Sequence, residues 1–343
     1  MEKNLDEQIE ETLKIYLASG VENQVDYQKF YLYSIVTHST AIEGSTVTEV
    51  ENQLLFDEGI AAKGRSLTEQ MMNVDLKDAY LYAFKMVSDS QSYTPDLLQQ
   101  LSSLVMRRTG SQYSTMGGNF DSSKGEFRLC NVSAGIGGRS YLSFNKIPRA
   151  VEEFCNWLNS EISTVDRTDI AGGYRLSFEA HFRLVTIHPW VDGNGRTTRL
   201  VMNMLQRQLG LVPSIVRTED KAEYIQALVD SRENDDSSIV QDVMLRHHIA
   251  NLNRRASQYC ENDGVNLKDD GVNLRSDGVK ILSKTLQRVL KAINENPEIR
   301  TTELIENLGV SESTVTRSTR ELKRLGLIRR EGSDKTGKWI ILK

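Results

Sequence analysis

A polar break between two apolar stretches, just after residue 187, constrains this 343-residue chain more than any other feature. Apolar residues lead up to Ile187 and resume at Leu200, so we predict two helices joined by a loop. The loop contains Gly193-Asn194-Gly195, and glycine permits positive φ angles and a close approach of the backbone. A glycine loop that opens a helix presents free N–H groups at the positive helix end. The segment therefore predicts an anion-binding site.

The charged residues around this loop add a metal ligand and a base. Arg196 and Arg199 lie three positions apart on one face of the second helix, so both can clamp one polyphosphate. Asp192 is suited to holding Mg²⁺, which binds through one or two carboxylates plus substrate phosphates. His188, with an ordinary pKa of about 6.5, is largely neutral at neutral pH and can act as a base. Together these parts predict nucleotidyl or phosphoryl transfer without a P-loop, since no GxxxxGK[ST] string occurs.

The whole string His188-Pro189-Trp190-Val191-Asp192-Gly193-Asn194-Gly195-Arg196-Thr197-Thr198-Arg199 resembles the Fic (Fido) signature HPFx[D/E]GNGRxxR. It departs at Trp190, where phenylalanine is usual and where we expect the side chain to pack inward. The region from about 30 to 250 is also similar to the Fic fold, which implies a mainly α protein with a small β-hairpin flap. The resemblance implies a protein adenylyltransferase that moves AMP from ATP to a Ser, Thr or Tyr hydroxyl of a protein.

The resemblance also implies roles for single residues. His188 deprotonates the target hydroxyl, which attacks the α-phosphorus, and Asp192 holds Mg²⁺. Tyr224 is a further nucleotide-binding candidate, near the base or the ribose. The residues expected to bind the phosphates are Gly193, Asn194, Gly195, Arg196 and Arg199.

A second motif, Ser39-Thr40-Ala41-Ile42-Glu43-Gly44, matches the inhibitory pattern [S/T]xxxE[G/N] of many Fic proteins. We place it in an inhibitory helix at about 35–50, with Gly44 as a helix stop. The resemblance implies that Glu43 pairs with Arg199, the arginine that the γ-phosphate needs. A tenfold bias between two states requires only about 1.4 kcal/mol, which one Arg–carboxylate pair can supply.

Two alternative functions stay open. In a de-AMPylase, Glu43 would orient water to remove AMP from a target. In a nucleotide-sensing transcription regulator, the Fic region would bind nucleotide without catalysis; His188 favours an enzyme, because a sensor needs no base. Another phosphate-bearing donor is not excluded by the sequence, although complete polyphosphate clamping favours ATP.

A glycine-rich segment from about 117 to 145 surrounds two β-like runs, 126–129 and 139–142, and predicts the flap hairpin. The resemblance implies that the flap registers the target as an added strand, with Phe127-Arg128 as its family mark. Among the other histidines, His181 is expected to make a buried polar contact, and His247 and His248 are expected to be solvated.

The chain is predicted to divide into an N-terminal helical region (1–110), a Fic core (111–260), a linker (261–280) and a winged helix-turn-helix (281–343). The last region carries 13 Lys and Arg against 8 Asp and Glu, on a chain of net charge −5. Contact with DNA phosphates is one expectation for this region, and dimerisation or target docking are its alternatives. The basic residues concerned are Arg317, Arg320, Lys323, Arg324, Arg329, Arg330, Lys335 and Lys338.

The composition, with 39% hydrophobic and 26% charged residues, is that of a globular protein. The sequence has neither a long apolar run nor a basic-then-apolar start, and its three cysteines, Cys130, Cys155 and Cys260, form no CxxC pair. We therefore expect a cytoplasmic protein, with a homodimer as one option for its assembly.

Overall fold

The computed structural model describes residues 3–134, 139–264, 273–274, 280–281, 284–297, 299–308, 312–324, 328–331 and 337–341. The chain divides into two compact units. The first contains Met1–Ile15 and Gln28–Asn253, and the second contains Tyr16–Tyr27 and Arg254–Lys343. The mainly α architecture expected from the sequence is confirmed.

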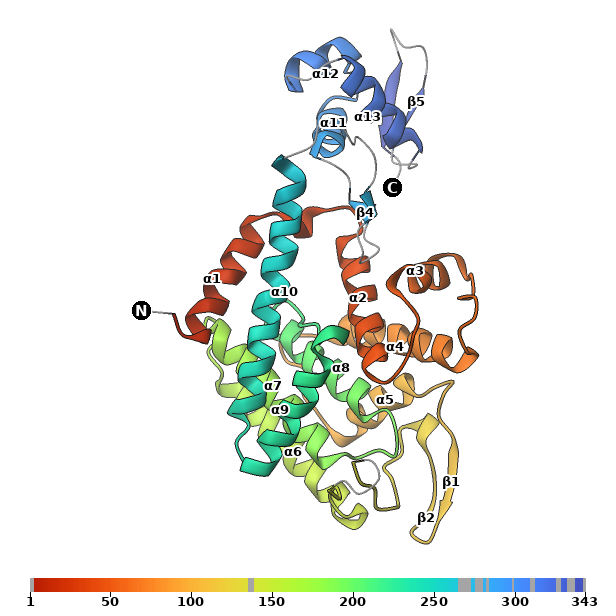
Figure 1. The fold of residues 1–343 in the computed structure, drawn as a ribbon, viewed down its shortest axis with the longest axis vertical. Coiled ribbons are helices and arrows are strands. Elements are labelled where there is room, and N and C mark those ends of the chain that lie inside the picture. Colours follow the sequence, from red (N-terminus) through yellow and green to blue (C-terminus); the bar gives the residue numbers. More distant parts are fainter. Residues whose placement is uncertain are drawn as a thin grey trace. The chain divides into compact units, whose positions relative to one another are not determined.

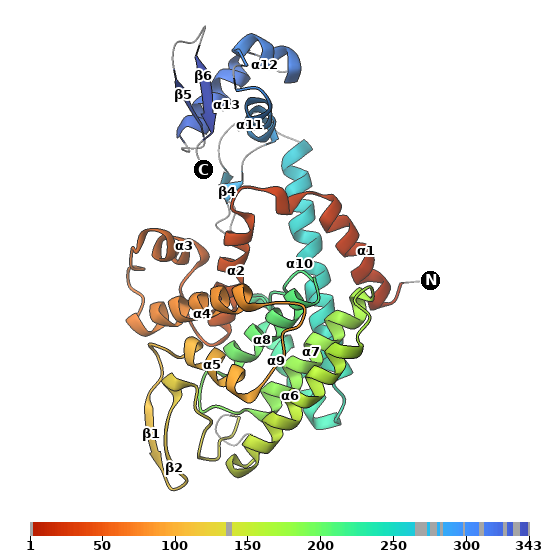
Figure 2. The same ribbon diagram turned by 180° about the vertical axis from the view of Figure 1, so that it is seen from behind.

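The α-helices up to residue 264 are α1 (Leu5–Ala18), α2 (Tyr27–Ile42), α3 (Glu49–Glu58), α4 (Leu67–Met86), α5 (Pro95–Val105), α6 (Ile147–Thr164), α7 (Ile170–Ile187), α8 (Asn194–Gln208), α9 (Lys221–Asn234) and α10 (Ser238–Gly264). Figures 1 and 2 give two opposite views of their arrangement. Short 3-10 turns occur at Val21–Asn23, Ser122–Lys124, Phe144–Lys146 and Thr218–Asp220. Most of the predicted N-terminal region (1–110) and Fic core (111–260) thus lies in the first unit, whereas Tyr16–Tyr27 and the residues from Arg254 onward belong to the second.

Helix α8 forms the centre of the first unit, in contact with α4, α5 and α7 (Figure 1). Most of its side chains are buried although many are polar, so those polar groups need partners. Asn203 accepts a hydrogen bond from the Tyr80 hydroxyl at 2.7 Å and donates to Gln206 and to the Ser214 carbonyl. The core of the unit is therefore built around the helix that follows the glycine loop.

The helix predicted at about 35–50 begins and ends earlier in the structure. Helix α2 ends at Ile42, and residues 43–48 form a loop before α3. Gly44 adopts a φ of 101°, and Thr48 opens α3 with a capping box. The prediction of a single helix over 35–50 was therefore wrong, because Gly44 and the Thr48 capping box divide this segment. Glu43 is the first residue after α2.

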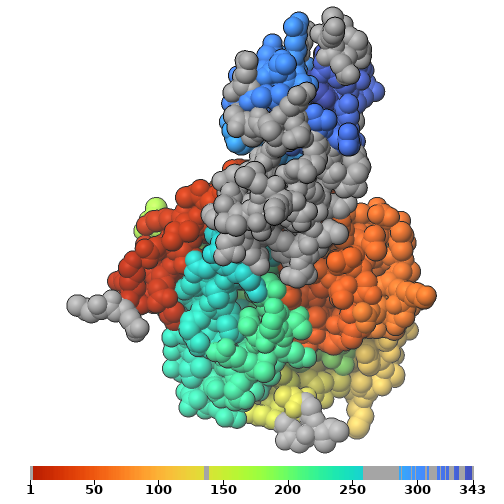
Figure 3. All heavy atoms as spheres, turned by 45° about the horizontal axis from the view of Figure 1, so that its top comes forward, coloured from red at the N-terminus to blue at the C-terminus, as the bar shows by residue number. Residues whose placement is uncertain are grey.

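The hairpin of the first unit lies earlier than predicted. Strands β1 (Gln112–Thr115) and β2 (Gly118–Asp121) pair antiparallel. They project beyond α5 in Figure 1, and in Figure 3 their surface (yellow) adjoins that of α3 and α4 (orange). A small two-stranded hairpin is thus confirmed, at a different position.

The two runs predicted as strands behave differently. Residues 126–129 form no strand, since the Arg128 N–H donates to the Pro189 carbonyl at 3.0 Å and the guanidinium turns inward to other backbone carbonyls. Residues 139–142 take part in a short antiparallel contact, with a bridge between Ser133 and Ser140 and a hydrogen bond from Tyr141 N to Val132 O at 3.0 Å. The glycines at 135, 137 and 138 lie outside the described residues.

The second unit contains the helices and strands predicted for a winged helix-turn-helix. They are α11 (Lys284–Glu295), α12 (Thr301–Leu308), α13 (Glu312–Arg324), β5 (Ile328–Glu331) and β6 (Lys338–Ile341), with a short pair β3 (Asn273–Leu274) and β4 (Lys280–Ile281) before them. Leu286, Val315, Leu322 and Trp339 form part of one apolar core. Helix α10 extends to Gly264, past the predicted linker start, and most of the Asp-Gly-Val-Asn-Leu repeat lies outside the described residues.

Two further predictions concern single side chains. His248 is 1% exposed and its ring lies 4.7 Å from that of Tyr174, so the prediction of a solvated His248 was wrong. The reason is that adjacent helical residues point to different faces, and the face of His248 is the inner one. Within the part of the chain that the structure describes, no helix has the length and apolar character needed to cross a bilayer.

Candidate active site

His188 lies at the end of α7 in a left-handed conformation, with φ 54° and ψ 61°. Its N–H donates to the Leu184 carbonyl, and its own carbonyl accepts from Arg128 Nε at 2.9 Å. Arg128 is fully buried and also donates to the carbonyls of Cys130 (2.6 Å) and Leu142 (2.5 Å). One buried guanidinium thus fixes both the backbone of His188 and the segment that faces it.

The imidazole of His188 is held in a partly buried setting. Nδ1 lies 3.3 Å from the Val185 carbonyl, which favours the tautomer with the proton on Nδ1 and leaves Nε2 as the acceptor. The Tyr141 ring stacks on it with centroids 3.8 Å apart and planes 16° apart. Burial lowers the pKa of His188 to about 4, so the ring is neutral at pH 7.

The loop after His188 is held by its own side chains. Asn194 accepts from Trp190 N at 3.1 Å and donates to the Trp190 carbonyl at 2.8 Å. Trp190 is buried, as predicted, and its indole N–H donates to the Gly125 carbonyl at 3.0 Å. Gly193, with a φ of 77°, precedes the first residue of α8. The helix–loop–helix predicted from the sequence is confirmed, and Asn194 shapes the loop.

The Glu43 carboxylate lies against the first turn of α8. A Cβ built on Gly195 would collide with Glu43 Oε1 and would lie 2.9 Å from an Arg199 nitrogen. Glycine at 195 is therefore what lets a carboxylate approach the helix N-terminus. This is the position at which the sequence predicted an anion.

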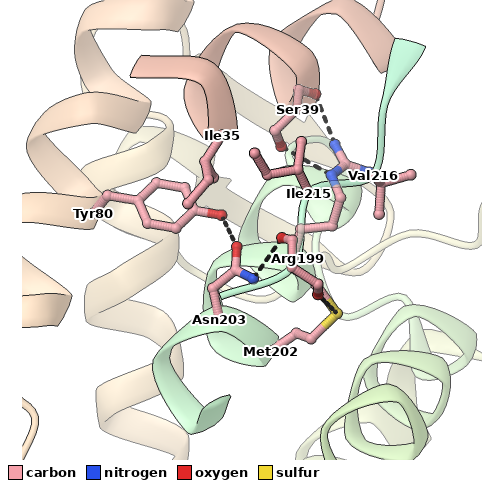
Figure 4. A pocket seen from close by; sticks show the side chains of 9 residues that line it. Ile35, Ser39, Tyr80, Arg199, Met202, Asn203, Ile215 and Val216 are labelled. Atoms are coloured by element: carbon pink, nitrogen blue, oxygen red, sulfur yellow. Dashed lines mark hydrogen bonds between the residues drawn. The ribbon is translucent and has the colours of Figure 1, made fainter. Parts of the chain in front are cut away.

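Arg199 and Glu43 form an ion pair with an Nη2–Oε1 distance of 2.6 Å. Ser39 holds the same guanidinium, since its hydroxyl accepts from Nε and its carbonyl accepts from Nη2, each at 2.9 Å (Figure 4). Burial by itself would raise the pKa of Glu43, but Arg199, with Arg196 and Lys221 nearby, holds it below its ordinary value. Glu43 is thus charged throughout the neutral range.

Arg196 is buried beside the same turn, and some of its N–H donors have no partner in the described residues. Nη2 lies 3.4 Å from Asp192 Oδ1 and 3.3 Å from Met106 Sδ. Its Nε and Nη1 are buried and have no hydrogen-bond partner within the described ranges. Burial lowers the pKa of Arg196, which indicates a cation kept from water. Such a group fits an anionic ligand at the start of α8.

Asp192 stands at the edge of the loop, with a side chain that is 61% exposed. Its Oδ1 accepts from Gly193 N at 2.6 Å and faces Arg196. The described residues contain no group of three or more His, Cys, Asp or Glu placed to hold a metal. A single exposed carboxylate beside the turn where the sequence predicts phosphate binding nevertheless suits Mg²⁺, which takes its other ligands from phosphates and water.

Tyr224 and His181 lie behind Arg199. The Tyr224 hydroxyl is 2.7 Å from His181 Nε2 and is hydrogen-bonded to Arg199. Both side chains are buried, which confirms the buried polar contact predicted for His181. The contact of Tyr224 with a nucleotide base or ribose stays a prediction, because the hydroxyl faces Arg199.

The sequence interpretation missed two residues near His188. The Tyr141 ring stacks on the His188 imidazole. The Arg232 guanidinium, from α9, lies over the Tyr141 ring, 5.2 Å from its centroid. Neither belongs to a recognisable motif. Only the folded chain brings residues 141, 188 and 232 together.

Comparison with known families shows which domain contains this loop. Residues 92–206 match the model of the Fic/DOC family, a range that begins before the predicted core boundary at 110 and includes the whole loop. The chain contains a Fic/DOC family domain. Residues 282–329 match a second model, described as winged helix-turn-helix DNA-binding.

Named relatives support the Fic assignment. The chain is 31% identical over 203 residues to protein adenylyltransferase Fic of Drosophila erecta, covering 58% of this chain and 37% of that protein. It is 28% identical over 236 residues to the protein of the same name from Drosophila melanogaster, covering 68% and 44%. The chain thus spans less than half the length of these relatives.

Solved structures share the fold. A Fic domain containing signaling protein from Bacteroides thetaiotaomicron superposes with a TM-score of 0.59 at 18% identity, over 77% of this chain and all of that chain. A Fic family protein from Desulfovibrio desulfuricans has the same TM-score and identity over 99% of this chain and 95% of its own. At this identity the likeness establishes the Fic fold alone.

Proposed function

We propose that the chain is a protein adenylyltransferase that transfers AMP from ATP to a Ser, Thr or Tyr hydroxyl of a protein. The observation that carries the proposal is the partly buried imidazole of His188 on the same loop as the glycine turn that opens α8, where buried Arg196 has two nitrogens without a partner in the described residues. The names of the Drosophila relatives support the same activity. A de-AMPylase is the alternative within the enzyme class.

In the proposed reaction, Nε2 of His188 takes the proton from the target hydroxyl. The hydroxyl oxygen then attacks the α-phosphorus, and the bond from the α-phosphorus to the oxygen that bridges the α- and β-phosphates breaks, so that pyrophosphate leaves. Arg196, Arg199 and the N–H groups of the first turn of α8 neutralise the charge on the phosphates. Asp192 would hold a Mg²⁺ ion, which supplies further positive charge when bound.

We propose that Glu43 restrains this activity. Its carboxylate occupies the guanidinium of Arg199 and the space over Gly195, so the terminal phosphate of ATP must compete with it for both. The Ser39 contacts keep Arg199 directed toward α2 at the same time. The relevant inhibitor is thus a residue of the chain itself.

The deciding experiment is mass spectrometry of the purified chain after incubation with ATP and Mg²⁺. The expected result is an added AMP on a Ser, Thr or Tyr side chain in Glu43→Gly protein, and none in the Glu43→Gly, His188→Ala double variant, which should still bind ATP. Release of AMP from a previously modified target, dependent on Glu43, would instead support the de-AMPylase. Transfer by the double variant would assign the base to another residue.

We also propose that the winged helix-turn-helix contacts nucleic acid, as its family model describes. Arg320 and Lys323 are exposed on α13, and Arg329 and Lys338 are exposed on β5 and β6. The Arg317, Arg324 and Lys335 side chains lie outside the described residues. Binding of the full chain to a DNA duplex should weaken steeply with salt if these cations meet phosphates, and a flat response would contradict the proposal.

A further inference from the structure

Three side chains from separate segments form a stack at the proposed base. The Tyr141 ring lies on the His188 imidazole at 3.8 Å, nearly parallel, and the Arg232 guanidinium lies 5.2 Å from the Tyr141 ring centroid. His188 is the residue after α7, Tyr141 belongs to the short antiparallel contact between 132–134 and 139–141, and Arg232 belongs to α9. The tyrosine therefore connects the base to a cation on another helix.

The surroundings hold this stack in place. The backbone of Tyr141 donates to Val132 at 3.0 Å, and the next residue, Leu142, accepts from Arg128. Arg128 also holds the His188 carbonyl, so the two stacked residues share one buried anchor. The Nε of Arg232 is buried and lacks a hydrogen-bond partner in the described part of the chain, which leaves the tyrosine ring as its described contact.

We propose that Tyr141 and Arg232 are positioning residues for His188, with Tyr141 fixing the plane of the imidazole and Arg232 fixing Tyr141. The proposal rests on the proposed function, since it assigns to the stack the orientation of Nε2 toward the target hydroxyl. Apart from this stack, the His188 imidazole makes one long hydrogen bond within the described residues, from Nδ1 to the Val185 carbonyl. A small change in the orientation of a general base relative to the proton that it removes lowers the reaction rate strongly.

The charged residues around His188 give the stack a measurable effect, a shift in the pKa of the imidazole. Arg128 and Arg232 lower the pKa of His188, whereas Glu43, on the loop after α2, raises it. Arg232 is thus expected to act on His188 in two ways, through the ring of Tyr141 and through its charge. Removal of Arg232 should raise the pKa of His188, and removal of the Tyr141 ring should do the same by admitting water.

The test uses the full chain with ¹³C-labelled histidine, since its five histidines can be assigned by substitution. The His188 C2–H resonance should carry an upfield ring-current shift in the parent and in Tyr141→Phe. This shift should vanish in Tyr141→Leu. The titration midpoint of His188 should rise in Arg232→Gln. The matched control is Arg207→Gln, which removes a cation from the Phe84 ring at 4.8 Å and should leave the His188 resonance unchanged.

AMP transfer, measured in the same variants on a Glu43→Gly background, completes the test. Tyr141→Phe should retain the rate, and Tyr141→Leu should lose about tenfold or more in kcat, with the KM for ATP little changed. An unshifted His188 resonance in the parent, or equal losses in Phe and Leu variants, would overturn the inference. If the NMR results hold and no variant transfers AMP, the proposed function fails while the orientation of His188 by the stack stands.

Discussion

Glu43 and Arg199 are 156 positions apart in sequence, yet their side chains meet at 2.6 Å over the first turn of α8. The arginine is almost fully buried, with 3% of its side chain exposed, whereas 32% of the glutamate side chain is exposed. The buried partner is fixed by several contacts, and the exposed partner is the one free to leave. Release of Glu43 therefore requires little rearrangement of the core.

The Glu43→Gly variant should label itself with radioactive ATP at least about tenfold faster than the parent, because one ion pair of about 1.4 kcal/mol suffices for that bias. The measurement is incorporation of α-³²P from ATP into the purified chain. Glu58→Gly, at the exposed end of α3, is the matched control and should label like the parent. Equal labelling in Glu43→Gly and parent protein would reject restraint by Glu43.

Ser39→Ala should give an intermediate rate. It removes the hydroxyl that accepts from Arg199 Nε but leaves the Ser39 carbonyl and Glu43 in place. Ser39→Thr keeps a hydroxyl and should behave like the parent in the same labelling assay. A Ser39→Ala rate equal to that of Glu43→Gly would mean that the hydroxyl, not the carboxylate, carries the restraint.

The pH dependence of transfer should reflect the buried state of His188. Its neutral form is the base, and burial lowers its pKa to about 4, so kcat/KM of Glu43→Gly should be flat from pH 6 to 8 and fall only below about pH 5. Circular dichroism at each pH controls for acid unfolding. A decrease in kcat/KM with a midpoint near pH 6.5 would contradict the lowered pKa of His188.

Arg128→Met should destabilise the protein by about 3 kcal/mol, because it strands three carbonyls that one buried cation now satisfies. The melting temperature should drop by about 6 to 12 °C for a unit of this size. Exposed Arg107 offers a control, since Arg107→Met should change stability by no more than about 0.5 kcal/mol. A melting curve that superposes on the parent's would show that the arginine is dispensable.

His248→Phe should make the protein less sensitive to mild acid. Burial lowers the pKa of His248 to about 3, and both ring nitrogens lack hydrogen-bond partners in the described residues. The folded state thus binds this proton less well than the unfolded chain, so its stability is full above about pH 6.5 and decreases as pH falls toward the folded pKa. Urea midpoints at pH 7 and pH 5 should differ less in His248→Phe than in the parent.

The sequence predicted the site better than the segments around it. The helix–loop–helix at 187–200, the inward Trp190 and the Glu43–Arg199 contact depend on short motifs whose spacing is local or recognisable. The flap strands were misplaced because the burial of Arg128 depends on carbonyls up to 60 positions away. His248 was misjudged for a similar reason, since nothing in its neighbourhood along the chain reveals which helical face is inner.

The glycine loop and its arginines belong to the innermost helix of the first unit, where polar side chains are locked to one another across the core. A substitution in α8 is therefore expected to alter both the stability of the fold and the geometry of the site, so few substitutions there can change the site alone. Tyr141 differs in this respect, because it reaches the His188 ring from a loop outside α8, so a change there touches the site without disturbing that polar core.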